Sequence, residues 1–240
     1  MTDLDLLHLE ARTLYVLTPD GRIARENDPD RSAGPRFWLA GCGGGNVARL
    51  HRSVASDIAA EIEALVRREP PFAEPDALPR FIADYRRLLP GAELSRDVVH
   101  ALPHGLAVET GAELIASDST AGARFVKTVA TDGMPHNLVD LRMRKVEDLW
   151  APWVILMAEG EVASMAFAAR LGRDGAELGL VTAPKFRGRG FARLVTAAWS
   201  GLPELRSRRL FYGADQDNLA SQRVIAQLGL RRIGVSLRLT

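Results

Sequence analysis

Cysteine is almost missing from this sequence, because Cys42 is the only one among 240 residues. No disulfide can close within the chain, which excludes a disulfide-stabilised scaffold and favours the reducing cytoplasm. Long apolar runs are missing as well, since the longest covers residues 151–158 and a bilayer span needs about 20 residues. The first residues carry acids where an export signal carries bases. We therefore expect a cytoplasmic protein that has neither a membrane span nor a membrane partner.

Metal-binding patterns are also lacking. None of the histidines has a metal-ligand spacing with Cys42, and the pair formed by His100 and His104 is interrupted by Pro103. The glycine-rich run at residues 41–46 lacks the Lys-Ser/Thr ending of a phosphate loop and the GxGxxG spacing of a dinucleotide fingerprint. We therefore predict that no metal is bound, and we interpret the glycine run as the flexible tip of a hairpin.

What is present is the composition of an ordinary globular protein, with 47% hydrophobic and 25% charged residues. The net charge is only +1, but residues 185–240 sum to +8 and residues 1–184 sum to −7. This asymmetry indicates that the C-terminal part meets an anion, either a nucleic acid or a phosphorylated cofactor. A nucleic-acid binder needs a contiguous basic face with aromatic residues, whereas Phe191 and Trp199 fall on the core side of a predicted helix. We therefore expect no nucleic-acid partner.

The N-terminal part carries signals for short strands and two helices. Hairpins are predicted for residues 13–18 with 22–26 and for residues 35–40 with 47–51. Two amphipathic helices follow, one with Ser56 as its N-cap and one that runs from the cap Asp76 to Pro90. Further strand-like pieces lie at residues 105–109 and 124–129.

The C-terminal part has a sharper pattern, which predicts a mixed α/β domain. Strands are predicted at residues 153–158, 161–170, 176–182, 210–214 and 230–239, and helices at residues 191–199 and from Asp217 or Asn218 to Gly229. We divide the chain into an α/β extension at residues 1–95 and a second domain at residues 96–240. The boundary between them falls somewhere from residue 92 to residue 134.

The run from Arg187 to Ala192, Arg-Gly-Arg-Gly-Phe-Ala, joins a predicted strand to a predicted helix. Its small residues, Gly188, Gly190 and Ala192, let the backbone approach a ligand without an obstructing side chain. The unpaired amides of the first helical turn then point at the ligand, and the helix dipole favours a negative charge there. Arg187 and Arg189 add positive charge. The run therefore predicts a pyrophosphate cradle.

This run resembles the acetyl-CoA motif of the GNAT superfamily of N-acyltransferases, R/Q-x-x-G-x-G/A, with Arg187, Gly190 and Ala192 in the defined positions. A second GNAT motif, Asn-x-x-Ala/Ser followed by Leu-Gly-Phe, is matched by residues 218–221 and 228–230. The resemblance covers roughly the last ninety residues. It implies an α/β (α+β) fold in which helices flank a twisted, mostly antiparallel sheet, here with an N-terminal α/β extension.

In that family the fourth and fifth strands separate, and the pantetheine arm of the acyl-CoA lies between them. The resemblance implies that the arm runs along residues 180–182, with Asn218 and Ser221 on its far side. The acyl group is then expected near a β-bulge of the fourth strand, facing an acceptor amine. The implied acyl-CoA contacts are Leu180, Val181, Thr182, Arg187, Gly188, Arg189, Gly190, Phe191, Ala192, Asn218 and Ser221.

One position departs from the family. The second motif often carries a tyrosine that protonates the departing thiolate, and this chain has Ile225 there. Another group protonates the thiolate, or solvent does, or the domain is not a catalyst. Tyr212 on the preceding strand is the candidate acid, and the alternative is an ordinary half-buried sheet residue. Glu177 is the candidate base, and the alternative is a solvated charge at a strand end.

The resemblance implies an N-acetyltransferase that moves the acetyl group of acetyl-CoA, its co-substrate, to an amine acceptor by direct attack in a ternary complex. The N-terminal extension would then help to form or cover the acceptor site. A non-catalytic acyl-CoA-binding regulatory module is the alternative, and the substitution at Ile225 favours it. The acceptor, the length of the acyl group and a homodimeric state stay open.

Overall fold

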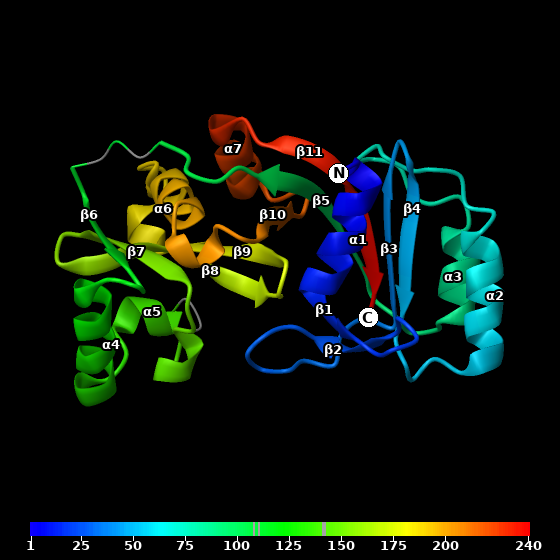
Figure 1. The fold of residues 1–240 in the computed structure, drawn as a ribbon, viewed down its shortest axis with the longest axis horizontal. Coiled ribbons are helices and arrows are strands. Elements are labelled where there is room, and N and C mark those ends of the chain that lie inside the picture. Colours follow the sequence, from blue (N-terminus) through cyan, green and yellow to red (C-terminus); the bar gives the residue numbers. More distant parts are fainter. Residues whose placement is uncertain (108, 110, 141–142) are drawn as a thin grey trace.

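A computed structural model of the protein describes residues 1–107, 109, 111–140 and 143–240. Its main feature is a nine-stranded sheet with the order β4-β3-β11-β5-β10-β9-β8-β7-β6 (Figure 1). The strands are β3 (Phe37–Cys42), β4 (Gly45–Leu50), β5 (Leu94–Leu102), β6 (Glu113–Ala116), β7 (Trp153–Ala158), β8 (Glu161–Leu171), β9 (Gly175–Thr182), β10 (Arg209–Ala214) and β11 (Arg231–Leu239). All neighbours are antiparallel except β9 and β10. The predicted fold class is confirmed.

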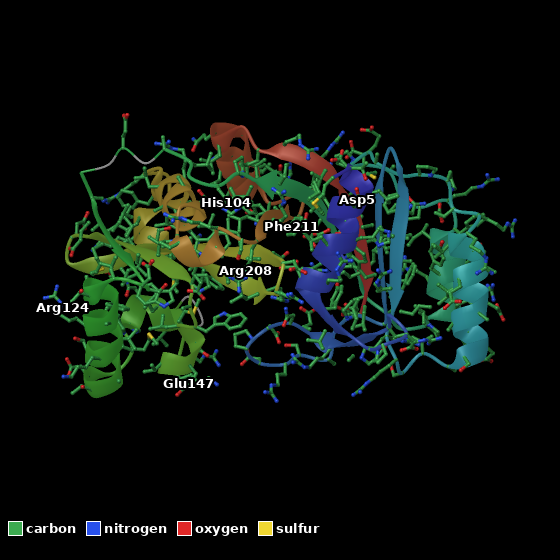
Figure 2. The ribbon with its side chains drawn as sticks, in the orientation of Figure 1. Asp5, His104, Arg124, Glu147, Arg208 and Phe211 are labelled. Atoms are coloured by element: carbon green, nitrogen blue, oxygen red, sulfur yellow. The ribbon has the colours of Figure 1, made fainter. Side chains whose placement is uncertain are left out.

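Helices cover both faces of this sheet. The helices are α1 (Asp3–Leu14), α2 (Ser56–Val66), α3 (Ile82–Leu88), α4 (Thr120–Asp132), α5 (His136–Asp140), α6 (Phe191–Ser200) and α7 (Leu219–Leu228). Side chains alternate along each strand, so β3 packs Trp38 with α1 on one face, and Phe37 with α2 and α3 on the other. In the same way, β10 packs Tyr212 towards α6 and α7, and Phe211 towards α1 at the centre of the sheet (Figure 2).

The N-terminal helix α1 is an element that the sequence analysis missed. Thr2 and Asp5 form a capping box at its start, in which each side chain accepts a hydrogen bond from the other residue's backbone amide. The predicted first hairpin is present, but it is short, because the residues up to Leu14 belong to α1 and only β1 (Tyr15–Leu17) pairs with β2 (Ile23–Glu26). Helix α1 therefore lies across the sheet and reaches β9, β11 and β3.

Two predicted strands are wrong. Residues 124–129 lie inside α4, because the side chain of Ser119 caps that helix by accepting a hydrogen bond from the Gly122 amide. The cap and the packing of α4 against β6 together override the strand propensity of the residues that follow. Of residues 105–109, residue 108 lies outside the described residues and the others are not in a strand. Asp76 is likewise not a cap, since α3 begins at Ile82.

Strand β5 joins the N-terminal extension to the rest of the protein. It lies between β10 and β11, antiparallel to both, and β11 pairs with β3 on its other side. The predicted division between residues 95 and 96 falls within β5. The division thus describes two segments of the sequence, and these segments share one sheet.

Strands β9 and β10 separate shortly after they begin. They pair at three positions only, the last of which joins Glu177 to Phe211. Beyond this point β9 stays paired with β8 as far as Thr182, while β10 stays paired with β5. The sheet therefore opens between β9 and β10, and this opening positions the candidate site.

Candidate active site

A cavity of about 660 Å³ lies at this opening, between the end of β9, the loop before α6, and the first turns of α6 and α7. Every acyl-CoA contact that the sequence predicted lines it, except Arg189. Six further lining residues were missed: Phe186, Arg193, Ala220, Arg223, Val224 and Gln227. Four of these recur at helical spacing on α7, a signal that could have found them.

The predicted cradle begins α6. Gly190 is the residue before the helix, and both it and Gly188 have a positive φ, of 77° and 78°. No atom lies within 4 Å of where a side chain would start at either glycine. The amides of Phe191 and Ala192 have no carbonyl partner within the helix, because they belong to its first turn. The cradle therefore presents free amide donors and the positive end of a helix dipole to the cavity.

The two arginines of the motif differ in position. Arg187 lines the cavity, and its Nε donates a hydrogen bond of 3.4 Å to the carbonyl oxygen of Thr182. Arg189 instead forms a 2.7 Å ion pair with Glu159, and its guanidinium lies 5.2 Å from the centre of the Phe186 ring. Arg189 thus holds the loop against the turn between β7 and β8, and the cavity wall does not include it.

The backbone of β9 offers hydrogen-bonding groups to the cavity. The Ala183 amide donates to Ala163 of β8, and the Ser164 hydroxyl donates to the carbonyl of Val181. Residues 181 and 183 therefore direct their backbone groups towards β8. Because these directions alternate in an antiparallel pair, Leu180 and Thr182 direct theirs away from β8, towards the opening.

The second motif builds the opposite wall. Asn218 caps α7, and its side-chain oxygen accepts a 3.2 Å hydrogen bond from the Ser221 amide. Gly229 ends the helix with φ of 60°, in the left-handed position that was predicted. Both Asn218 and Ser221 line the cavity. The motif residues thus fix the start and end of α7 and so the position of this wall.

Glu177 lies on the other face of the sheet, where α1 covers it, and is only 8% exposed. Burial raises the pKa of its carboxyl group, and the nearby guanidinium groups of Arg238 and Arg170 partly oppose this rise. Both arginines have other partners, since Arg170 pairs with Glu26 and Arg238 pairs with Asp97 at 3.2 Å. The solvated strand-end alternative for Glu177 is therefore wrong.

A second buried carboxyl group comes from α1. Glu10 is 2% exposed, and its Oε2 has no hydrogen-bond partner among the described residues. Burial raises the pKa of Glu10 well above its ordinary value, and the charge of Glu177 adds to this rise. Within the described part of the chain, neither glutamate forms an ion pair. The two carboxyl groups on this face of the sheet therefore lie near the guanidinium of Arg238, and neither forms a salt bridge with it among the described residues.

Tyr212 lies on the face of the sheet that carries the cavity, whereas Glu177 lies on the opposite face. Tyr212 is buried against α6 and α7, and its phenol lies close to the side chain of Ser221 at the start of α7. Burial raises the pKa of this phenol. Ile225 on α7 is buried in the same apolar cluster. A tyrosine side chain is thus present in the same cluster as Ile225, the position where the family motif places one, but it comes from the sheet.

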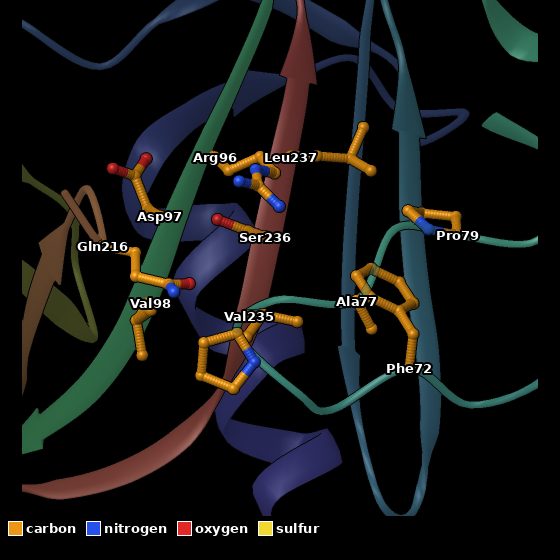
Figure 3. A pocket seen from close by; sticks show the side chains of 11 residues that line it. Phe72, Ala77, Pro79, Arg96, Asp97, Val98, Gln216, Val235, Ser236 and Leu237 are labelled. Atoms are coloured by element: carbon orange, nitrogen blue, oxygen red, sulfur yellow. The ribbon is translucent and has the colours of Figure 1, made fainter. Parts of the chain in front are cut away.

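The described residues also line two further cavities. One of about 410 Å³ lies on the Glu177 side, between the end of α1, β1 and the turn from β8 to β9. The other has a volume of only about 10 Å³, room for a single water, beside β5 and β11 (Figure 3). Gln216 closes its rim by donating a hydrogen bond to Asp76.

In the part of the chain that the structure describes, no three His, Cys, Asp or Glu side chains come together as metal ligands would. The described helices are all too short or too polar to cross a bilayer.

The family model of the acetyltransferase (GNAT) domain matches residues 107–231, just over half of the chain. The chain therefore belongs to the GNAT acetyltransferase family, a family of acyltransferases that use an acyl-CoA and an acceptor. No curated protein matches the chain in sequence.

Solved structures similar to the chain include a GNAT-family protein from Novosphingobium aromaticivorans, with 16% identity, coverage of 97% of this chain and 93% of that one, and a TM-score of 0.47. A GCN5-related N-acetyltransferase from Kribbella flavida has 16% identity, coverage of 67% and 63%, and a TM-score of 0.45. A GNAT-family acetyltransferase from Colwellia psychrerythraea has 15% identity, coverage of 80% and 75%, and a TM-score of 0.43.

Proposed function

We propose that the protein is an N-acetyltransferase that transfers the acetyl group of acetyl-CoA to an amine by direct attack in a ternary complex. The observation that carries this proposal is the cavity at the opening between β9 and β10, with the cradle at one end and Glu177 across the sheet. In this proposal the acyl end of a ligand held in the cavity would reach the gap between β9 and β10, and Glu177 would act as the base from the other face.

The binding part of the proposal rests on the cradle and on β9. The free amides after Gly190 and the guanidinium of Arg187 would hold the pyrophosphate of CoA. The amide groups of the pantetheine arm would pair with the backbone of Leu180 and Thr182, which faces the opening. Asn218 and Ser221 would line the other side of the arm.

The chemical part assigns Glu177 as the base. It would take a proton from the acceptor's ammonium group, so that the free amine attacks the thioester carbonyl and backbone amides hold the developing oxyanion. The new C–N bond forms, the C–S bond breaks, CoA leaves as a thiolate, and the nitrogen gives up its second proton to solvent as the amide forms. Tyr212 carries its proton at neutral pH, as phenols do, and would donate it to this thiolate, although the burial that raises its pKa makes it a weaker acid; solvent is the other proton donor.

The acceptor side is built partly by the N-terminal extension. Helix α1 places Glu10 near Glu177, and neither carboxyl group forms a salt bridge among the described residues, although the guanidinium of Arg238 lies near both. An acceptor that arrives as an ammonium ion would form an ion pair with these carboxyl groups. The cavity of about 410 Å³ beneath the end of α1 lies on the same face as Glu177 and supports entry from this side.

A non-catalytic acyl-CoA-binding module is the second candidate, and the burial of Glu177 favours it together with the apolar Ile225. Thiol release from acetyl-CoA, measured with a panel of primary amines, separates the two. The enzyme produces free CoA in proportion to acetylated amine, whereas the module binds acetyl-CoA in calorimetry without thiol release. Failure to bind acetyl-CoA at all would exclude both candidates.

A further inference from the structure

The ring of Phe167 lies directly on β9 beside the opening. Phe167 of β8 is in register with Gly179, so both residues face the same side of the sheet, which is the side of Glu177. A side chain at Gly179 would begin 2.5 Å from the Cε2 and Cζ atoms of this ring. These are atoms at the tip of the ring, so Phe167 reaches across β9 towards β10.

The ring explains why residue 179 is a glycine. The φ angle of Gly179 is outside the left-handed region, so its backbone conformation is open to any residue. The space that a side chain would need is instead taken by Phe167, which is only half-buried. Phe167 and Gly179 therefore form a complementary pair, in which the absence of a side chain at Gly179 makes room for the Phe167 ring over β9.

On the β10 side the opening is bordered by a glycine, which has no side chain. If the parallel pairing of β9 and β10 continued, Gly179 would face Gly213, but the last pair joins Glu177 to Phe211. A side chain at Gly213 would begin 3.1 Å from Oε1 of Glu177. On this face the opening thus lies between two glycines, with the carboxyl group of Glu177 on one side and the tip of Phe167 on the other.

We propose that Phe167 determines acyl specificity, because its ring admits an acetyl group at this exit of the opening and blocks longer acyl chains. The inference rests on the proposed function and adds a selecting residue to it. An arm held by the cradle and by Leu180 brings its thioester to the next residue of β9, which is Gly179. The acyl group then emerges against the Phe167 ring, which leaves room for an acetyl group and obstructs a longer chain.

The test compares acetyl-, butyryl- and hexanoyl-CoA in the wild type, Phe167→Ala and Phe167→Leu. Two quantities are measured for each thioester, the dissociation constant by calorimetry and kcat/KM with the best amine of the panel. The matched control is Phe125→Ala, which removes a partly buried ring of the same apolar cluster on α4, 5.9 Å from the Trp153 ring. Phe167→Leu preserves most of the apolar volume, so that one variant folds even where the alanine is too disruptive.

The wild type should prefer acetyl-CoA. Phe167→Ala should raise the preference for hexanoyl-CoA relative to acetyl-CoA by about tenfold or more, the scale of a pocket contact that accepts or rejects extra methylenes. Phe167→Leu should give a smaller rise, and Phe125→Ala should leave the ratio unchanged. An unchanged ratio in folded Phe167 variants overturns the proposal, as does an equal change in Phe125→Ala.

Two further outcomes are informative. If the Phe167 variants change only the KM of the amine, the ring belongs to the acceptor side and the acyl assignment is wrong. If the wild type binds acetyl-CoA but releases no thiol, the proposed enzymatic function fails. The calorimetric ratio of hexanoyl- to acetyl-CoA then still decides whether Phe167 selects the acyl chain.

Discussion

The substitution Gly190→Val tests the cradle most directly. Gly190 precedes α6 with φ of 77°, and no atom lies within 4 Å of where its side chain would start. The substitution therefore meets no steric obstacle from neighbouring residues. Its cost comes from the backbone, because a β-branched residue disfavours the left-handed region.

The magnitude follows from what the backbone does next. Keeping a non-glycine residue in this region costs roughly 1–2 kcal/mol. If the backbone leaves the region instead, the first-turn amides of α6 turn away from the pyrophosphate. The loss of two charge-assisted hydrogen bonds, at roughly 1.5–3 kcal/mol each, weakens CoA binding by about two to four orders of magnitude.

The assay is calorimetry with CoA, together with thermal unfolding of each variant. Gly21→Val is the matched control, because Gly21 has φ of 79°, has no atom within 4 Å of its missing side chain, and lies in the turn between β1 and β2. We expect both variants to lose a similar amount of stability and only Gly190→Val to lose CoA. An unchanged CoA affinity in folded Gly190→Val would refute the cradle. An equal loss of CoA affinity in both variants would show that the loss comes from reduced stability and not from the cradle.

Three further predictions concern the two faces of the sheet. Glu177→Gln should lower kcat by about tenfold or more with little change in CoA affinity, and should remove the acidic limb of the pH–rate profile. Tyr212→Phe should lower kcat less, and a larger loss in Tyr212→Phe would make the tyrosine the more important group. Asn218→Ala should cost about 1 kcal/mol of stability and also weaken CoA binding, whereas Ser119→Ala, which removes the cap of α4, should cost stability alone, as unfolding and calorimetry can show. Burial raises the pKa of Glu10, so the folded state holds this proton more tightly than the unfolded state, and stability falls as pH rises above the ordinary carboxyl pKa. Glu10→Gln should reduce this fall when unfolding is measured from pH 4 to pH 8. An unchanged dependence of stability on pH would contradict the raised pKa of Glu10.

Much of the candidate site was predictable because its residues act locally. Gly190 before α6 and Asn218 as the cap of α7 use backbone and capping preferences that operate within a few residues. The lining residues of α7 follow the same helical repeat and could have been added to the prediction. By contrast, Arg189 was misplaced, because its ion pair with Glu159 joins segments 30 positions apart.

The strand predicted at residues 124–129 failed for a related reason. Its phenylalanine, valines and threonine favour a strand by propensity, but Ser119 supplies a helix cap and the helix α4 packs on the sheet. Helix α1 was missed because its apolar residues cover much of its circumference, as a helix that packs closely on the sheet allows.

The sequence by itself determined the family, the motif residues and the order of the C-terminal strands and helices, since these depend on local spacing and conformation. Only the tertiary structure decided where β5 enters the sheet, how far β9 and β10 stay paired, and that α1 buries Glu177 beside Glu10. It also decided that the ring of Phe167 occupies the space above Gly179. Each of these is a contact between segments distant in the sequence, and such contacts follow from the packing of the whole core.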